Sequence, residues 1–372
     1  MMNDKLHWAY TLPKDPHIYF DIFGEKYRYL PSEENYLGGG AMGDVYRGYR
    51  SNGAVVAVKR VKDCYSNNKM IRQRAVLEGN LGFRHSNLIE MLGCCVVNPD
   101  NGPIFLLSNF VNGENIDVYI KESLKNLPPD VRVEKISIII KQVLDALDYL
   151  HSRGIVHRDI KPSNIMVENN SNVRLMDLGI ARMSGGNQFS SAGFIGTPDY
   201  ASPEQIKRDV NYNPLSSNDA TMGIDAQSDI YSLGIVFYEM ITGENPMRAS
   251  VDEIKKEKNG NNVAQNGNNG NNGMSDVDSL TLVNQMYKKL PVNSKIPAKL
   301  MKVIHKATEK DKSKRYKTAM EFKQAIEDAY LPDPSPWESL STWIQNNAMI
   351  VISCAFGFAV LIIILLLAII AL

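Results

Sequence analysis

The sequence lacks several features that would narrow its class at once. Lysine and arginine number 41, aspartate and glutamate also number 41, and no strongly basic block occurs, so nothing indicates a nucleic-acid partner. The 4 cysteines among 372 residues are too few for a disulfide framework and fit a reducing compartment. Residues 1–30 contain no apolar stretch typical of a secretory signal peptide. Hydrophobic residues make up 44% of the chain, enough for one large core or two smaller ones.

The C-terminal run, residues 348–372, contains no charged side chain. As a helix it would be about 37 Å long, enough to cross a hydrocarbon core of roughly 30 Å. Trp337 and Trp343 precede it, where aromatic side chains would sit at a membrane interface. We therefore expect a single-pass tail anchor in a lipid bilayer, joined to the globular part by a linker over residues 332–347. Residues 324–347 contain no Lys or Arg, so the positive-inside rule does not set the orientation.

The rest of the chain divides into zones of different pattern. Residues 20–111 contain strand-like runs punctuated by Gly and Asn, which is typical of an antiparallel sheet, and one helix-like stretch over 69–81. Residues 112–331 are mostly helical in pattern, and 228–243 are apolar nearly all round, which predicts a central buried helix. An Asn- and Gly-rich insert at about residues 256–275 has almost nothing to bury and predicts a disordered loop.

A glycine-rich stretch, "LGGGAMGDVY", begins at Leu37. Gly38, Gly40 and Gly43 form the pattern G-x-G-x-x-G. A dinucleotide-binding fingerprint has the same spacing, but there a helix follows, whereas strand-like residues follow here. The glycines are therefore predicted at the tip of a hairpin, where a backbone without side chains can lie close to phosphates. Lys59, in "VAVK" one strand later, could pair with phosphate oxygens or with a carboxylate.

Two further motifs carry groups suited to phosphoryl transfer. "HRDIKPSN", residues 157–164, places an acid, a lysine and an amide within six positions. Asp159 can accept a proton from an attacking hydroxyl, Lys161 can neutralise charge on the transferred group, and Asn164 can ligate a hard cation. "DLG", which begins at Asp177, could place a second oxygen ligand on the same cation.

These motifs, with "SPE" at residues 202–204, occur in the order found in the eukaryotic-like protein kinases, which the chain resembles over about residues 22–331. The resemblance implies an α+β, two-lobed fold with ATP in the cleft. An extension, 1–21, would precede a small antiparallel N-lobe, 22–111, and a helical C-lobe, 112–331. Lys161 and "GTPDYASPEQ" resemble serine/threonine kinases, and the C-terminal anchor with "GIAR" resembles bacterial membrane-anchored members.

The resemblance also implies roles for individual residues. Asp159 would be the catalytic base, Lys161 and Lys59 would contact phosphates, and Asn164 and Asp177 would hold Mg²⁺. Contacts to ATP would come from the two lobes and the hinge between them: Leu37, Gly38, Gly40, Gly43, Val45, Ala57, Lys59, Glu78, Asn109, Val111, Met166 and Asp177. Two structural roles are implied as well: Glu204 would pair with Arg315, and Asp229 would hold the backbone of the catalytic loop.

The carboxylate that pairs with Lys59 is less well defined. Counting 19 residues forward from Lys59 gives Glu78, a separation usual in the family, whereas counting nine back from His85 gives Val76. We favour Glu78 because it is an acid. Gly79 and Gly82 follow it and weaken a helix by up to about 1 kcal/mol each, which predicts a mobile helix. Leu178 stands where the family usually has Phe. This smaller side chain predicts that Glu78 is held only loosely in the position facing Lys59.

The predicted function is transfer of the γ-phosphate of Mg-ATP to Ser or Thr hydroxyls of proteins. Autophosphorylation is expected between "DLG" and Gly196, where Ser184, Ser190 and Ser191 are candidates, Ser190 and Ser191 are favoured, and a homodimer is one route. Thr197, the next residue after Gly196, is a further candidate but is expected mainly to shape the substrate cleft through its hydroxyl. Two alternatives remain open: a membrane-tethered pseudokinase scaffold and a small-molecule phosphotransferase of similar fold. The kinase domain is expected on the cytoplasmic side of the membrane.

Overall fold

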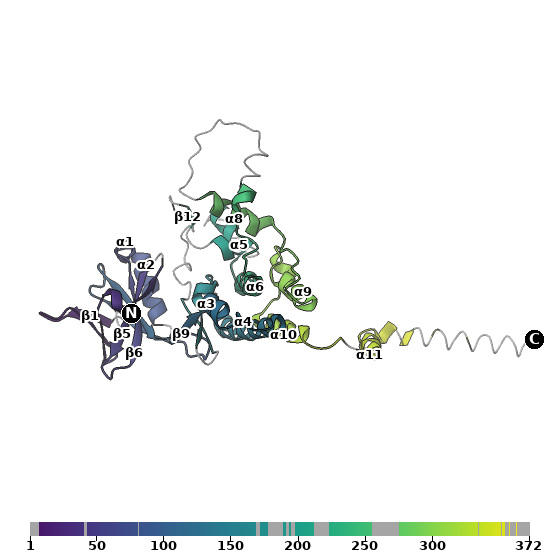
Figure 1. The fold of residues 1–372 in the computed structure, drawn as a ribbon, viewed down its shortest axis with the longest axis horizontal. Helices are drawn as coiled ribbons and strands as arrows, with labels where there is room; N and C mark the ends of the chain where they lie inside the picture. The colour runs from purple at the N-terminus through teal and green to yellow at the C-terminus, as the bar shows by residue number, and fades with distance from the viewer. Residues whose placement is uncertain are drawn as a thin grey trace, which may run out of the picture. The chain divides into compact units, whose positions relative to one another are not determined.

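The computed structural model of the protein divides into two units, residues 1–329 and residues 330–372. It describes residues 7–40, 43–80, 82–168, 172–177, 189–190, 193–194, 198–211, 223–254, 275–333, 335–350, 352, 353, 357 and 362. The first unit contains a strand-rich N-terminal lobe and a helical C-terminal lobe (Figure 1). The predicted α+β, two-lobed architecture is therefore present in this unit.

The N-terminal lobe is an eight-stranded sheet with the order β3-β2-β1-β7-β8-β6-β5-β4. Its strands are β1 (His7–Thr11), β2 (Ile18–Ile22), β3 (Glu25–Tyr29), β4 (Tyr36–Gly39), β5 (Gly43–Arg50), β6 (Val55–Val61), β7 (Met91–Val96) and β8 (Ile104–Asn109). β3 also pairs with the last residues of β5, while β4 pairs with earlier residues of β5. The sheet therefore closes on itself as a ring of strands, and β4 is attached outside the ring.

This closed sheet begins earlier in the chain than predicted. The expected lobe boundary at residue 22 falls inside β2, and β1 pairs in parallel with β7 through His7 and Trp8. The alternation in β2 and β3 explains why these segments join the sheet: Phe20 and Ile22 face inward, and so do Tyr27 and Tyr29. Short strands become stable when a shared apolar face is buried in this way.

The interior of the closed sheet is a cluster of buried side chains, here named the barrel core: Ala9, Phe20, Ile22, Tyr27, Tyr29, Val56, Val58, Cys95, Phe105 and Leu107. Three aromatic rings occupy its centre. The Phe20 ring lies 5.1 Å from that of Phe105 and 5.7 Å from that of Tyr29. Edge-on and offset contacts of this kind add to the stabilisation from burial alone.

The other face of β7 and β8 packs against the helix of the lobe, α2 (Lys69–Gly79). Cys94 points to this face and Cys95 to the barrel core, because successive side chains of a strand alternate. Both thiols are buried and free, and burial raises the pKa of Cys94 to about 12. This cysteine pair therefore belongs to a buried strand.

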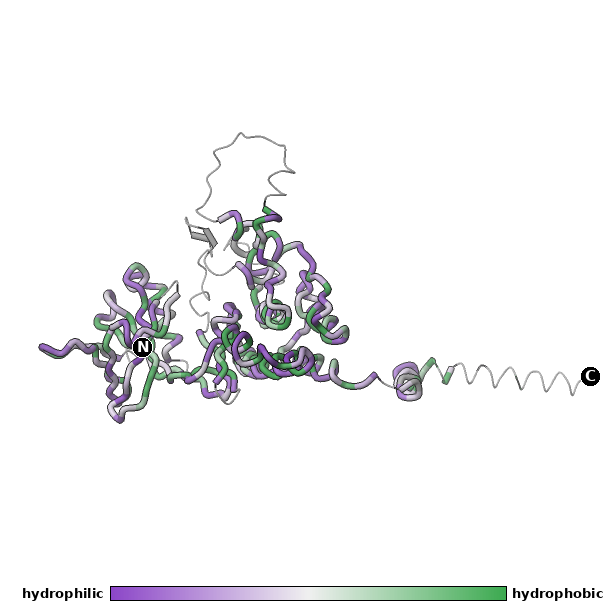
Figure 2. The backbone as a smooth tube through the Cα atoms, in the orientation of Figure 1, coloured by the Kyte–Doolittle hydropathy of each residue, from purple (hydrophilic) through white to green (hydrophobic). Residues whose placement is uncertain are grey.

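The C-terminal lobe is built on two buried helices, α4 (Pro129–His151) and α6 (Ala226–Thr242). Nearly every residue of α6 is buried, as predicted, and Figure 2 shows hydrophobic residues concentrated along both helices. Asp225 caps the start of α6 by accepting from the Gln227 N–H, and Gly243 ends it with φ of 85°. The remaining helices of this lobe include α3 (Ile116–Glu122), α5 (Pro203–Asn211), α8 (Asp276–Tyr287), α9 (Ala298–Ala307) and α10 (Ala319–Ala329).

The second unit contains the helix α11 (Pro336–Asn346), which forms within the segment expected to be a linker. Ser335 and Glu338 form a reciprocal capping box at its start, so the local sequence specifies where the helix begins. Among the residues that the structure describes, no helix is long and apolar enough to cross a membrane. Most of the predicted anchor, and the Asn- and Gly-rich insert up to residue 274, lie outside the described residues.

Candidate active site

The glycine-rich stretch lies on the hairpin of β4 and β5, as predicted, and no helix follows it. Gly38 pairs with Val45 and has φ of 141°, a conformation that side chains disfavour. The Gly40 N–H donates to the Gly43 carbonyl at 2.9 Å and so narrows the end of the hairpin. A Cβ atom on Gly43 would lie 2.5 Å from the carbonyl oxygen of Arg60, so the pairing with β6 requires glycine there.

Lys59 extends from β6, beside β5, toward the C-terminal lobe. Its Nζ lies 2.8 Å from Asp177 Oδ1, an ion pair that joins residues 118 positions apart in the chain. Burial disfavours the charged ammonium, but the nearby carboxylates of Asp177 and Glu78 outweigh this effect and raise the pKa of Lys59. Lys59 is therefore a protonated side chain held in the cleft between the two lobes.

Glu78 lies near Lys59 but does not form the expected direct ion pair with it; Asp177 takes that place. The Glu78 side chain is buried, and burial raises the pKa of its carboxyl to about 7, with Lys59 opposing the shift. The predicted mobility of α2 stays a prediction; α2 ends at Gly79, and Gly82 lies beyond it with φ of 57°. A Cβ atom on Gly79 would lie 2.6 Å from the Cys94 backbone nitrogen, so this glycine lets the helix approach β7.

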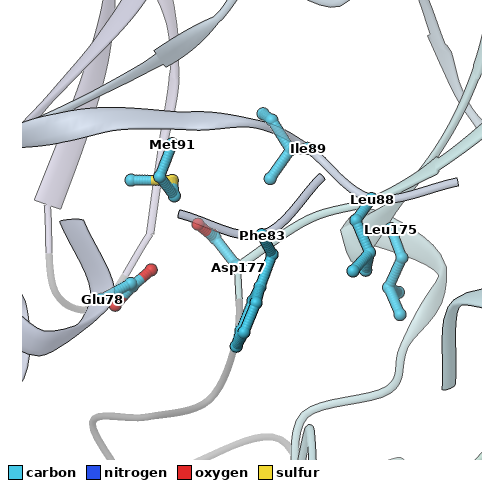
Figure 3. A pocket seen from close by; sticks show the side chains of 7 residues that line it. All are labelled: Glu78, Phe83, Leu88, Ile89, Met91, Leu175 and Asp177. Carbon is cyan, nitrogen blue, oxygen red and sulfur yellow. The ribbon is translucent and has the colours of Figure 1, made fainter. Parts of the chain in front are cut away.

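A small cavity of about 10 Å³ lies between Glu78 and Asp177. Figure 3 shows the ring of Phe83 beside Asp177 in this cavity, whose remaining walls are Leu88, Ile89, Met91 and Leu175. Phe83 also makes an edge contact with Tyr149 of α4, at 6.0 Å between ring centroids. Sequence reasoning missed Phe83, since it follows Gly82 in a loop without periodicity. Leu178, which stands where the family usually has Phe, lies outside the described residues.

Asp229 of α6 holds the backbone of the loop that carries Asp159, as predicted. Asp229 accepts hydrogen bonds from the backbone N–H of His157 at 2.8 Å and of Arg158 at 2.7 Å. His151 contributes a ring contact to the same carboxylate, at 2.8 Å from Nε2. Arg158 has φ of 65° and Asp177 has φ of 48°. Residues with side chains rarely adopt these values, and they keep them only where the surrounding contacts hold the backbone in place.

His157 connects this loop to the segment before Asp177, a role that the sequence did not reveal. Its ring is fully buried, and burial lowers its pKa, which favours the neutral imidazole. The Asp159 N–H donates to Nδ1 at 3.3 Å, so Nε2 carries the proton and donates to the Met176 carbonyl at 2.9 Å. One tautomer of His157 thus links the backbones next to Asp159 and Asp177.

Asp159 has two of the predicted partners beside it. Lys161 Nζ lies 3.0 Å from Asp159 Oδ2, and Asn164 Nδ2 donates to the Asp159 carbonyl at 2.8 Å. The Met176 N–H donates to the Asn164 carbonyl at 2.8 Å, which brings the Asn164 and Asp177 segments together. The structure therefore brings Lys59, Asp159, Lys161, Asn164 and Asp177 close together.

The donor set fits Mg²⁺ bound together with a phosphate. The nitrogen of the Asn164 amide is engaged by Asp159, which leaves Oδ1 as the atom suited to a cation, and the Asp177 side chain is 46% exposed. Within the described ranges, no group of three or more His, Cys, Asp or Glu side chains could hold a metal alone. Mg²⁺ commonly takes one or two protein ligands and completes its shell with phosphate oxygens and water.

The other residues expected around the nucleotide lie on elements that border the cleft. Ala57 is buried on β6 opposite Ser108 of β8, and Met166 lies on β10 (Ile165–Glu168). Asn109 donates its side-chain amide to Glu90 Oε2 at 2.8 Å, and with Val111 it lines a cavity of about 390 Å³. Leu37 and Val45 lie on the glycine hairpin. No contact here tests whether these residues touch ATP, so their roles stay predictions.

The predicted ion pair between Glu204 and Arg315 is confirmed. Arg315 Nη1 and Nη2 donate to the two carboxylate oxygens of Glu204 at 2.7 and 3.0 Å, and Ser228 Oγ adds a third bond at 2.7 Å. Burial would raise the pKa of Glu204, but these donors outweigh it and lower the pKa. The pair joins α5 to the segment before α10.

Of the predicted phosphorylation sites, only Ser190 falls in the described residues. Its backbone pairs with Gly193 in the short hairpin of β12 (Phe189–Ser190) and β13 (Gly193–Phe194). Ser184, Ser191 and Thr197 lie outside the described residues.

Comparisons with known proteins agree with this geometry. Residues 32–331 match the protein kinase domain family, and the chain belongs to this family. A probable serine/threonine-protein kinase of Clostridium perfringens is 32% identical over 314 residues, covering 81% of this chain and 38% of the relative. A probable serine/threonine-protein kinase of Streptomyces coelicolor is 31% identical, covering 59% of this chain and 32% of the relative. These relatives place the chain with the eukaryotic-like serine/threonine kinases.

A lectin receptor-like serine/threonine-protein kinase of Arabidopsis thaliana is 32% identical, covering 60% of this chain and 26% of the relative. The chain thus spans less than two fifths of the length of each of these relatives. The crystal structure of the Mycobacterium tuberculosis PknI kinase domain aligns with a TM-score of 0.52 at 19% identity, covering 79% of this chain and 94% of that one. This structural likeness supports the protein kinase fold.

Proposed function

We propose that the protein is an active serine/threonine kinase that transfers the γ-phosphate of ATP to Ser or Thr hydroxyls of proteins. The observation that carries the proposal is the ion pair between Lys59 and Asp177 beside the loop of Asp159. Groups with the chemistry of phosphate binding, metal binding and proton acceptance converge there from β6, from the loop after α4 and from the segment after β11 (Val173–Leu175). The family supports the same reaction.

In the proposed reaction, the substrate hydroxyl oxygen forms a bond to the γ-phosphorus, and the bond from that phosphorus to the β–γ bridging oxygen breaks. ADP leaves with the electron pair, and Asp159 accepts the hydroxyl proton. Lys161, at 3.0 Å from Asp159, lies where it can balance charge on the transferred group. Mg²⁺, held by Asn164 and Asp177, would neutralise charge on the phosphates. Most of the catalysis then comes from positioning and charge neutralisation.

The test is transfer of label from γ-labelled ATP to protein Ser or Thr by the full chain. Lys59→Met, Asp159→Asn and Asp177→Asn should each abolish transfer while leaving the thermal unfolding transition nearly unchanged. Lys62→Met is the matched control, because Lys62 is an exposed lysine just after the same strand. Near wild-type turnover in any of the three site variants would refute the assignment.

A membrane location and autophosphorylation form the finer part of this proposal. The uncharged apolar run of residues 348–372 supports a membrane anchor. The kinase domain is proposed to lie on the cytoplasmic side. The serines between Asp177 and Gly196 support autophosphorylation, for which Ser190 and Ser191 are the favoured sites and two copies of the chain could act on each other. Mass spectrometry of the active protein beside Asp159→Asn tests this: phosphate at these serines in both proteins would contradict autophosphorylation.

The alternative of a pseudokinase scaffold predicts the opposite pattern. Such a protein would bind nucleotide with Lys59 and Asp177 but would transfer no label. The presence of Asp159, Lys161 and Asn164 in contact with one another favours the active enzyme.

A further inference from the structure

The helix α11 exposes its large apolar side chains on one face. Trp337 is 79% exposed, Leu340 46%, Trp343 54% and Ile344 41%. At about 100° per residue, these positions fall within an arc of about 120°. The opposite side of the helix carries only polar residues, among them Glu338, Thr342, Gln345 and Asn346. The helix is therefore amphipathic, with two of the three tryptophans of the chain on its apolar face.

Two properties of α11 indicate that it is stabilised by contact with another apolar surface. It has 11 residues, and isolated helices shorter than about 12–15 residues are marginal in water, even with a good cap. Its apolar face is also large and rigid, since indole rings contribute much area with little rotamer freedom. Adsorption of this face to an apolar phase would stabilise both the helix and its exposed side chains.

The sequence around α11 indicates which partner. Residues 348–372, which follow directly, are uncharged and apolar, so α11 adjoins a segment suited to a hydrocarbon phase. Tryptophan is enriched at the level of lipid headgroups, where one edge of the ring is apolar and the N–H reaches water. Asp333 and Glu338 are the charged residues between 330 and 347, and no basic residue is present.

We propose that α11 lies flat in the interface of the lipid bilayer, with Trp337, Leu340, Trp343 and Ile344 directed into it. This inference rests on the proposed membrane tether, and it changes the role of residues 332–347. They form a surface-bound helix that holds the start of the anchor close to the headgroups, rather than a free linker. Without Lys or Arg, α11 binds through apolar area alone, so its insertion is independent of anionic lipid and of salt.

The experiment measures tryptophan depth in the full chain reconstituted into phosphatidylcholine vesicles. A background with Trp8→Phe leaves Trp337 and Trp343, and adding Trp343→Phe or Trp337→Phe isolates each one. A matched control replaces all three tryptophans by Phe and adds Thr342→Trp, which places a reporter on the polar side of α11. Quenching is measured with lipids brominated near the headgroup or deep in the acyl chain, and with acrylamide in the water. Flotation of the vesicles reports the tether independently.

For a helix that lies flat, Trp337 and Trp343 should both lose emission with the shallow brominated lipid, to the same extent, and should be shielded from acrylamide. The Thr342→Trp reporter should show the reverse. The same result is expected with phosphatidylserine present and in high salt.

Each other outcome overturns the inference in a distinguishable way. Exposure of Trp337 to acrylamide in a chain that still floats would leave the tether standing and remove the role of α11. Protection from acrylamide without quenching by either lipid would show a protein partner instead. Deeper quenching of Trp343 than of Trp337 would show an upright helix. Failure of the chain to float would overturn the proposed tether itself.

Discussion

The strands that precede the matched kinase region are predicted to be part of the catalytic domain, and Phe20→Ala tests this. Phe20 lies on β2, before the start of the family match at residue 32. Its side chain has no exposed surface and lies at the centre of the barrel core. If the N-terminal strands were an appendage, removing this side chain would leave the rest of the lobe unaffected.

The structure allows a magnitude to be given for this substitution. Truncating a buried Phe to Ala costs about 3–5 kcal/mol, because transfer free energy is lost and a cavity remains. Phe20 belongs at the upper end of this range, since it contacts Phe105 of β8 and Tyr29 of β3 and links early strands to the kinase sheet. A loss of this size is a large part of the roughly 5–15 kcal/mol that stabilises a typical domain.

The assay is urea unfolding of the full chain, followed beside the affinity for nucleotide. Phe23→Ala is the matched control, because Phe23 follows the same strand but is 76% exposed, and its loss should cost about 1 kcal/mol or less. Phe20→Ala should lower both stability and nucleotide affinity. A free energy of unfolding within about 0.5 kcal/mol of wild type would refute the reasoning, and so would full stability in a chain that begins at residue 32.

Other substitutions test the remaining contacts. Arg315→Ala should cost about 3–5 kcal/mol in the free energy of unfolding, since it strands the buried Glu204 carboxylate, whereas the neighbouring exposed Lys314→Ala should be nearly neutral. Gly79→Ala should destabilise by about 1–3 kcal/mol through its clash with β7, and a gain from improved helix propensity would show the packing to be wrong. Glu78 has a pKa raised to about 7, so its contribution lowers stability as pH rises from about 4.5 to 7, by up to about 3 kcal/mol. Glu78→Gln should remove this part of the pH dependence in urea titrations, and an unchanged pH profile would contradict the assignment.

The grouping of the candidate site residues could be predicted from the sequence because phosphate and metal chemistry restrict both residue type and spacing. Asp159, Lys161 and Asn164 lie within six positions, and the loop that holds them is too short to separate them. The contacts of Asp229 and Arg315 were expected for a different reason, because the resemblance to the family implied them. The ion-pair partner of Lys59 could not be predicted from the sequence. Lys59 lies near two carboxylates, those of Asp177 and Glu78, and only the fold decides which one it contacts.

The N-terminal strands were missed for a different physical reason. β1 pairs with β7, and β3 pairs with the end of β5, so their partners lie far along the chain or beyond an intervening hairpin. A strand of five residues carries little periodic signal by itself, and its stability comes from the neighbours that bury its inner face. Phe83 was missed for a related reason: a side chain in a loop is positioned by its contacts and leaves no periodic pattern in the sequence.

These separate findings meet at β7. One face of this strand carries Cys95 into the barrel core, and the other presents Cys94 to α2, where Gly79 permits close approach. The edge of the same strand pairs with β1. Because packed interiors transmit displacements rather than absorb them, a change in the N-terminal strands must reach α2, and with it Glu78. The closed sheet is therefore expected to set the position of Glu78 relative to Lys59 through β7.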